Sequence, residues 1–91
     1  MELRHLRYFV AVVEAQSFTK AAEKLFIAQP PLSRQIQNLE NELGIQLFER
    51  GSRPLQTTAA GQFFYQHAVK LLSNAEEVKS MTKRIGMVER S

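Results

Sequence analysis

The sequence predicts a mainly α-helical fold, in which three short helices and a small hairpin are followed by one long helix. Apolar residues recur at helical spacing in three stretches before Gly44, with breaks at Gln16-Ser17 and before Pro30. Short apolar pieces around a Gly/Ser/Pro turn follow and are typical of a hairpin. From Thr58 the helical spacing returns and continues for roughly eight turns.

The composition is that of one small globular protein. The chain has 91 residues, 44% of them hydrophobic, and a formal net charge of +3. Without cysteine it has neither disulfides nor thiolate metal sites, which favours a reducing compartment. No apolar run approaches the ~20 residues that span a bilayer, and the N-terminus lacks the apolar core of a signal peptide. We therefore expect a cytoplasmic protein without a membrane partner.

The first two helices are expected over residues 3–15 and 18–25. Ser17 is suited to cap the second helix, because its hydroxyl can accept a hydrogen bond from a free backbone N–H. The small pair Ala21 and Ala22 allows two short helices to cross closely. The apolar face of the first helix comprises Leu3, Leu6, Phe9, Val10 and Val13.

A third helix is expected to open at Pro30-Pro31, where a missing N–H costs nothing, and to end at Gly44. Its inner stripe comprises Leu32, Ile36, Leu39 and Leu43. Between Phe26 and Leu39 the only formal charge is Arg34. A polar helix face with a single cation is suited to entering a DNA groove.

The segment after Gly44 is expected to form a hairpin around residues 50–54. A hairpin that follows a helix-turn-helix is a wing, so the sequence predicts a winged helix-turn-helix. Arg50 and Arg53 are expected at the tip of the wing, against the phosphate backbone or in a minor groove. Taken alone, the two arginines fit solvated loop charges equally well.

The long helix carries an apolar seam in alternating steps of four and three, the spacing of a coiled coil. A helix about 45 Å long cannot be buried by so small a domain. The seam therefore predicts a partner helix, most simply the same helix of a second copy. The expected dimer interface comprises Phe64, Ala68, Leu71, Ala75, Val78 and Ile85.

Catalytic and metal-binding motifs are lacking. The chain has no aspartate and no glycine-rich phosphate loop, and its serines and glutamates are not spaced as a nucleophile and its base. His5 and His67 lie far apart without companion ligands. We expect no enzyme, no cofactor and no metal. The alternative to a DNA-binding domain is a helical module that binds protein through its long helix and polar face.

The order of these motifs resembles the N-terminal domain of LysR-type transcriptional regulators over essentially the whole chain. The finer pattern of residues 28–33 and 51–54 is similar to the branch that controls bacterial degradation of aromatic compounds such as benzoate and catechol. The matching residues are Leu6-Arg-Tyr-Phe9, Ser17 to Ala22, Leu25, Gln29 to Arg34, Ile36, Leu39-Glu40, Leu43-Gly44, Leu47 to Arg50, Thr58 and Gly61.

The resemblance implies a winged helix-turn-helix over residues 1–57 and a linker helix over residues 58–91 that pairs antiparallel in a homodimer. It also implies a C-terminal effector-binding domain, which this chain lacks, a tetramer in the full-length regulator and a small-molecule inducer bound only by the missing domain. The expected partner is double-stranded operator DNA, an interrupted palindrome with a T and an A bracketing the spacer.

Site residues follow from the resemblance, position by position. The residues that would face the major groove are Gln29, Pro30, Pro31, Ser33 and Arg34. Arg34 is the candidate for a bidentate contact to guanine, and Gln29 for a contact to adenine. The residues that would hold the DNA backbone are Thr19, Lys20, Arg50 and Arg53. Ala28 departs from the family pattern, because a serine or threonine cap is frequent there.

Overall fold

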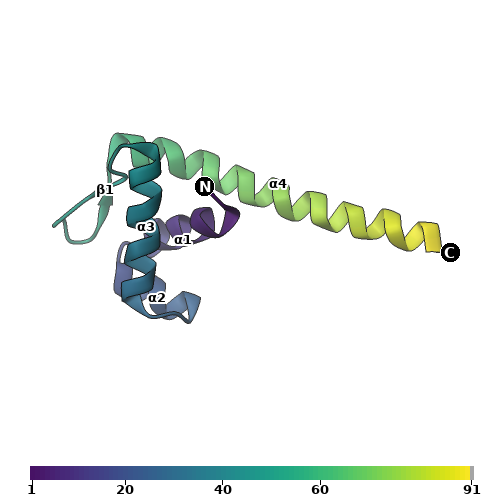
Figure 1. Ribbon diagram of the computed structural model, residues 1–91, viewed down its shortest axis with the longest axis horizontal. Coiled ribbons are helices and arrows are strands. Elements are labelled where there is room, and N and C mark those ends of the chain that lie inside the picture. The colour runs from purple at the N-terminus through teal and green to yellow at the C-terminus, as the bar shows by residue number, and fades with distance from the viewer. Residues whose placement is uncertain (91) are drawn as a thin grey trace.

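Three short helices, a two-stranded hairpin and one long helix succeed one another along the chain. The computed structural model describes residues 1–90. Figure 1 shows the short helices and the hairpin gathered at one end, with the long helix extending away from them. The elements are α1 (Leu3–Ala15), α2 (Phe18–Leu25), α3 (Gln29–Leu43), β1 (Phe48–Glu49), β2 (Gln56–Thr57) and α4 (Ala59–Arg90). The predicted fold class is confirmed.

The helix ends follow the local chemistry of the sequence. The Ser17 hydroxyl accepts a hydrogen bond from the backbone N–H of Lys20 at 3.1 Å and caps α2 as predicted. Gly44 ends α3 in the left-handed region, with φ of +73°. Ala28 precedes α3 without a side-chain cap. Proline in the first turn of α3 leaves no intrahelical bond unmade, because the N–H groups there have no helical acceptor.

The core lies where α1, α2, α3 and the wing meet. Phe9 of α1 is fully buried, and its ring centroid lies 5.4 Å from that of Phe48 and 5.1 Å from that of Phe64. Ala21 and Ala22 are also buried, which lets α2 approach its neighbours closely as predicted. The other buried apolar residues are Leu6, Val12, Leu32, Ile36, Leu39, Leu47 and Ala68. Leu43 was expected in this core, but it is 37% exposed because α3 ends there.

The wing is a short antiparallel ribbon that is held at several points. Phe48 pairs with Thr57, and Glu49 pairs with Gln56. Within the loop, the Ser52 hydroxyl donates to the Glu49 carbonyl at 2.7 Å and accepts from the Gln56 N–H at 3.0 Å. These bonds give a loop with little regular structure a defined shape.

The start of α4 is attached to the segment that precedes β1 and leads into the wing. The Thr58 N–H donates to the Leu47 carbonyl at 3.0 Å, and the Thr58 hydroxyl donates to the Gln46 carbonyl at 2.8 Å. The same hydroxyl accepts from the Gly61 N–H at 3.0 Å and so caps the helix. Thr58 therefore fixes the direction in which α4 leaves the wing.

Only the first part of α4 packs on the short helices. The Tyr65 hydroxyl donates to Glu14 of α1 at 2.8 Å, and Ala68 is 1% exposed. Farther along, Val78 and Ile85 are 56% and 59% exposed. Within residues 1–90 no helix combines the length and the hydropathy that crossing a membrane requires.

The expected dimer seam is divided by this arrangement. Phe64 and Ala68 were assigned to the interface with a second copy, but both pack against the core of their own chain. The assignment of Ala68 was wrong, because this side chain is 1% exposed and the sequence period cannot separate a seam used internally from one that faces a partner. Phe64 is half-buried, and its assignment to the interface stays a prediction. Leu71, Val78 and Ile85 remain exposed along the projecting part of α4.

Candidate nucleic-acid interface

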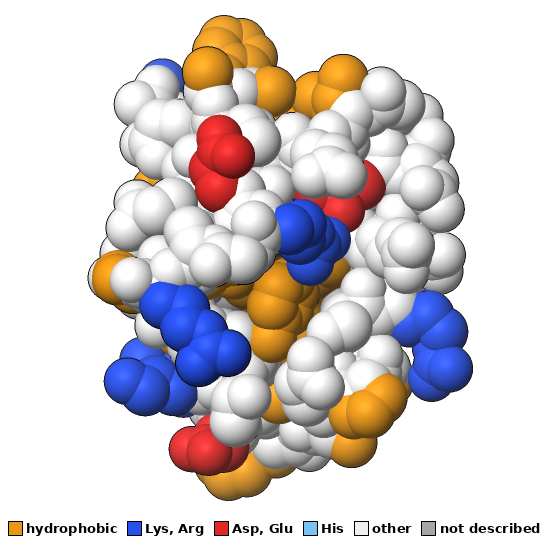
Figure 2. All heavy atoms as spheres, turned by 90° about the vertical axis from the view of Figure 1, so that its left-hand side faces the viewer, with side chains coloured by type: hydrophobic (Ala, Val, Ile, Leu, Met, Phe, Trp, Pro, Cys, Tyr) orange, Lys and Arg blue, Asp and Glu red, His pale blue; other side chains and the backbone are white. Residues whose placement is uncertain are grey.

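The outward face of α3 presents polar side chains that are free of carboxylates over its first ten residues. Gln29, Pro30 and Arg34 are exposed, and Pro31 and Ser33 are half-buried. The Gln29 amide donates to the Ser33 hydroxyl at 2.6 Å, so two of the predicted base-reading side chains are brought together. Figure 2 shows this end of the molecule, where Lys and Arg side chains are spread over a surface that consists mainly of the backbone and of side chains that are neither charged nor hydrophobic.

The Arg34 side chain forms neither a hydrogen bond nor an ion pair with any residue of the described chain. All five N–H donors of its guanidinium group therefore face solvent. An exposed arginine on a helix face without a competing carboxylate can form two parallel hydrogen bonds to a guanine edge. The geometry fits the predicted role of Arg34.

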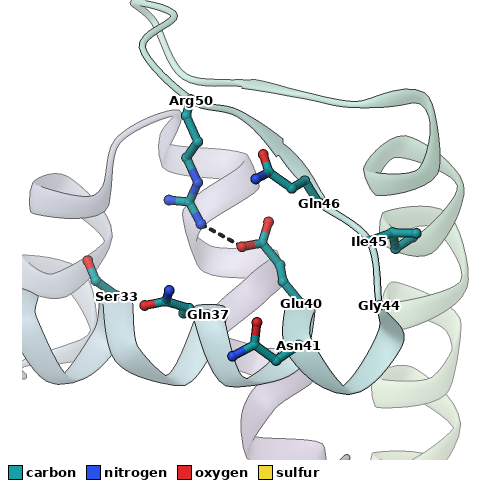
Figure 3. Close-up of a pocket in the computed structure, with 8 residues that line it drawn as sticks. All are labelled: Ser33, Gln37, Glu40, Asn41, Gly44, Ile45, Gln46 and Arg50. Carbon is teal, nitrogen blue, oxygen red and sulfur yellow. Dashed lines mark hydrogen bonds and ion pairs between the residues drawn. The ribbon is translucent and has the colours of Figure 1, made fainter.

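A groove of about 620 Å³ separates α3 from the wing. Figure 3 shows the side chains that line it, which come from the outer face of α3 on one side and from residues 44–50 on the other. The lining residues are Ser33, Gln37, Glu40, Asn41, Gly44, Ile45, Gln46 and Arg50. Four of these residues carry uncharged hydrogen-bonding side chains, and the two charged ones are the carboxylate Glu40 and the cation Arg50.

Arg50 occupies a different place from the one predicted. It directly follows β1 and points back toward α3, where its Nη2 donates to Glu40 Oε1 at 2.6 Å (Figure 3). Its guanidinium carbon also lies 5.3 Å from the ring centroid of Phe18, within cation–π range. The expected position at the tip of the wing was therefore wrong, because a buried carboxylate on α3 attracts this cation.

Glu40 was missed as a site residue by the sequence reasoning. It is 7% exposed, and its second oxygen, Oε2, accepts the backbone N–H of Leu47 at 2.7 Å. Asn41 and Gln46, which also line the groove, were missed as well. Asn41 could have been found from the period of α3, since Ser33, Gln37 and Asn41 follow one another at four-residue steps.

The remaining predicted backbone-binding residues lie at exposed positions. Arg53 lies in the wing loop and has no ion-pair partner within residues 1–90. Thr19 and Lys20 lie in the first turn of α2, where Lys20 is exposed and Thr19 lies at the surface. The free backbone N–H groups of a helix N-terminus and a lysine both favour contact with phosphate. These three positions therefore suit the predicted backbone contacts.

A match to a known family accounts for this arrangement. Residues 3–62 match the family described as "Bacterial regulatory helix-turn-helix protein, lysR family". The chain belongs to the LysR family. This confirms the family that the sequence motifs indicated.

The LysR-family chain is similar to several bacterial transcriptional regulators. It is 77% identical over 91 residues to the HTH-type transcriptional regulator BenM of Acinetobacter baylyi, a match that covers 100% of this chain and 30% of BenM. It is 52% identical over 90 residues to the HTH-type transcriptional regulator CatR of Pseudomonas putida, covering 99% of this chain and 30% of CatR. The chain thus spans about 30% of the length of the curated relatives it matches.

The fold is that of a solved LysR-family DNA complex. The crystal structure of the BenM DNA-binding domain with catB site 1 DNA superposes with a TM-score of 0.95 at 76% sequence identity. The superposition covers 98% of this chain and 96% of the BenM chain. The short helices, the wing and the long helix are therefore arranged here as in that domain.

Proposed function

We propose that this chain is the DNA-reading part of a bacterial LysR-type transcriptional regulator and binds an interrupted palindromic operator as a dimer. The observation that carries the proposal is the exposed face of α3. On this face the Arg34 side chain has no partner within residues 1–90 and lies among uncharged hydrogen-bonding groups. The similarity to a BenM domain that was crystallised with DNA supports it.

Base reading is assigned to the first turns of α3. Arg34 would form two hydrogen bonds to O6 and N7 of guanine, and Gln29 would read adenine. Pro30 and Pro31 would meet a thymine methyl group, and Ser33 would hold a phosphate or a base edge. The 2.6 Å bond between Gln29 and Ser33 limits the orientations that the Gln29 amide can present to a base.

Contacts with the DNA backbone are assigned to cations and helix ends around α3. Thr19 and Lys20, at the start of α2, would bind the sugar–phosphate backbone of one DNA strand. Arg53, in the wing, would contact DNA phosphates. Such contacts fix the register of the protein on DNA without reading its sequence.

Dimerisation is assigned to α4. The exposed apolar residues Leu71, Val78 and Ile85 follow one another at seven-residue steps, and Ala75 lies between them on the same face. Residues 1–57 would then be the DNA-binding unit and residues 58–91 the linker helix. A two-fold dimer matches a palindrome with half-sites about one helical turn, or a multiple of it, apart.

The regulator would act in the cytoplasm on genes of aromatic-compound catabolism, without catalysing a reaction itself. This target follows from the similarity to BenM and CatR. A small-molecule inducer and tetramer formation are assigned to a further domain, since this chain covers only 30% of the length of BenM.

The test is fluorescence anisotropy of a labelled duplex carrying an interrupted T…A palindrome, compared with a scrambled duplex across a salt series. We expect tighter binding to the palindrome and an affinity that falls steeply with salt. Arg34→Ala should reduce the affinity by roughly 1–3 kcal/mol and relax the preference at one base pair in each half-site.

Lys79→Ala is the matched control, because Lys79 carries the same charge on the projecting part of α4. It should leave the base preference unchanged. Equal and weak binding to both duplexes, unaffected by Arg34→Ala, would refute the proposal. It would favour the alternative of a helical module that binds protein.

A further inference from the structure

The groove between α3 and the wing contains the cationic side chain of Arg50, whose position is fixed by contacts within the protein. We infer that Glu40 is a positioning residue that holds Arg50 as a clamp for one phosphate of the DNA strand crossing this groove. The inference rests on the proposed function, because it requires α3 to face the major groove.

The placement of the strand follows from the shape of DNA. A sugar–phosphate strand separates each major groove from the adjacent minor groove. If α3 enters the major groove and the loop that bears Arg53 reaches the minor groove, this strand must pass between α3 and the wing. The groove of about 620 Å³ lies there, and its walls carry the uncharged side chains of Gln37, Asn41 and Gln46.

Arg50 is held in place from two sides. Its Nη2 donates to Glu40 at 2.6 Å, and its guanidinium group lies over the Phe18 ring at 5.3 Å. The side chain remains 44% exposed and forms no other hydrogen bond within residues 1–90. The remaining N–H donors of the planar group are therefore available to a phosphate, which arginine can bind through two parallel hydrogen bonds.

The carboxylate of Glu40 does not compete with a phosphate for further hydrogen-bond donors in this groove. Both of its oxygens are engaged, one by the Leu47 N–H at 2.7 Å and one by Arg50, and the residue is 7% exposed. The ion pair with the guanidinium group thus offsets the negative charge that Glu40 brings to the groove. Without Glu40, the flexible Arg50 side chain would have to be immobilised when DNA binds, and affinity would fall.

A double-mutant cycle on DNA affinity tests this inference. Glu40→Gln, Arg50→Gln and the double variant of the 91-residue chain are titrated against the palindromic duplex across a salt series. The amide oxygen introduced by Glu40→Gln can still accept the Leu47 N–H, and thermal unfolding verifies that each variant is folded. Arg50→Gln should weaken binding to all duplexes and lower the salt slope by about one for each protomer.

Glu40→Gln should weaken binding about three- to tenfold when Arg50 is present and have no further effect when it is absent. An equal effect in both backgrounds would overturn the inference, because a merely structural role through Leu47 does not depend on Arg50. An unchanged affinity and salt slope in Arg50→Gln would also overturn it.

A second variant tests the inference even if Glu40→Gln does not fold. Arg50→Lys keeps the charge but loses the planar fork, so it should retain the salt slope and bind less tightly. Binding as tight as that of the unaltered chain would refute the clamp. A persisting preference for the palindrome in all variants would show that the proposed function holds even where the clamp fails.

Discussion

Gly61 of α4 lies directly against the backbone of Leu47, so that a Cβ atom at Gly61 would overlap the Leu47 carbonyl oxygen and lie 3.2 Å from the Thr57 Cβ. No side chain fits into this space. The Leu47 carbonyl already accepts the Thr58 N–H, so it cannot move without breaking that bond. The close approach joins the long helix to the wing and sets the angle between them.

Gly61→Ala is therefore expected to destabilise the fold by about 1–3 kcal/mol or more, the usual cost of overpacking. Chemical denaturation monitored by circular dichroism measures this change. Gly86→Ala is the matched control in the same helix, because nothing lies within 4 Å of a Cβ at Gly86. It should stabilise the helix by roughly 0.5–1 kcal/mol. Equal effects of the two substitutions would contradict this account.

Arg53→Ala should weaken DNA binding by a similar factor for every sequence and lower the salt slope by about one for each protomer. The reason is that Arg53 lies exposed in the wing loop and is assigned to phosphate. Arg53→Lys should restore most of the slope, because a lysine also neutralises a phosphate. A selective loss of preference at one base pair would instead assign Arg53 to base reading.

Val78→Glu should shift the chain from dimer to monomer, measured by sedimentation velocity. Val78 is 56% exposed in the middle of the apolar seam of α4, and a carboxylate there would lose its hydration on pairing. Ser80→Glu adds the same charge about 200° around the helix and serves as the control. If Ser80→Glu disrupts the dimer equally, the seam is assigned to the wrong face.

The Tyr65–Glu14 hydrogen bond makes the free energy of unfolding depend on pH in the alkaline range. The hydrogen bond to Glu14, together with burial and the charge of Glu14, raises the pKa of the Tyr65 phenol above its ordinary value of 10.0. The folded state then keeps the Tyr65 proton at pH values where the unfolded state has lost it. This contribution to stability is fully present below about pH 10 and is lost as pH rises through the raised pKa.

Tyr65→Phe should therefore reduce the free energy of unfolding by about 0.5–1.5 kcal/mol at neutral pH. The difference between the variant and the unaltered chain should shrink above about pH 10. Urea denaturation at several pH values measures both effects. A difference that stays constant up to about pH 11 would show that the hydrogen bond does not couple to ionisation.

Local chemistry made most of the fold predictable. Ser17 as a cap, Gly44 as a helix end and the buried pair Ala21 and Ala22 all depend on residues close in sequence. Helical spacing is likewise a local property, so the bounds of α1 and α2 agree with the expected ranges. The exposed positions of Gln29, Pro30 and Arg34 agree with the groove-facing residues that the family resemblance implied.

The sequence by itself thus determined the helices, the wing, the polar face of α3 and membership of the LysR family. Only the tertiary structure decided the pairing of Arg50 with Glu40 and the burial of Ala68 within its own chain. Both involve different elements, whose distance is set by core packing around Phe9 and by the contact of Gly61 with Leu47. A sequence period shows that a face is apolar or polar. It does not show which neighbour covers that face, because that depends on the angles at which the elements pack.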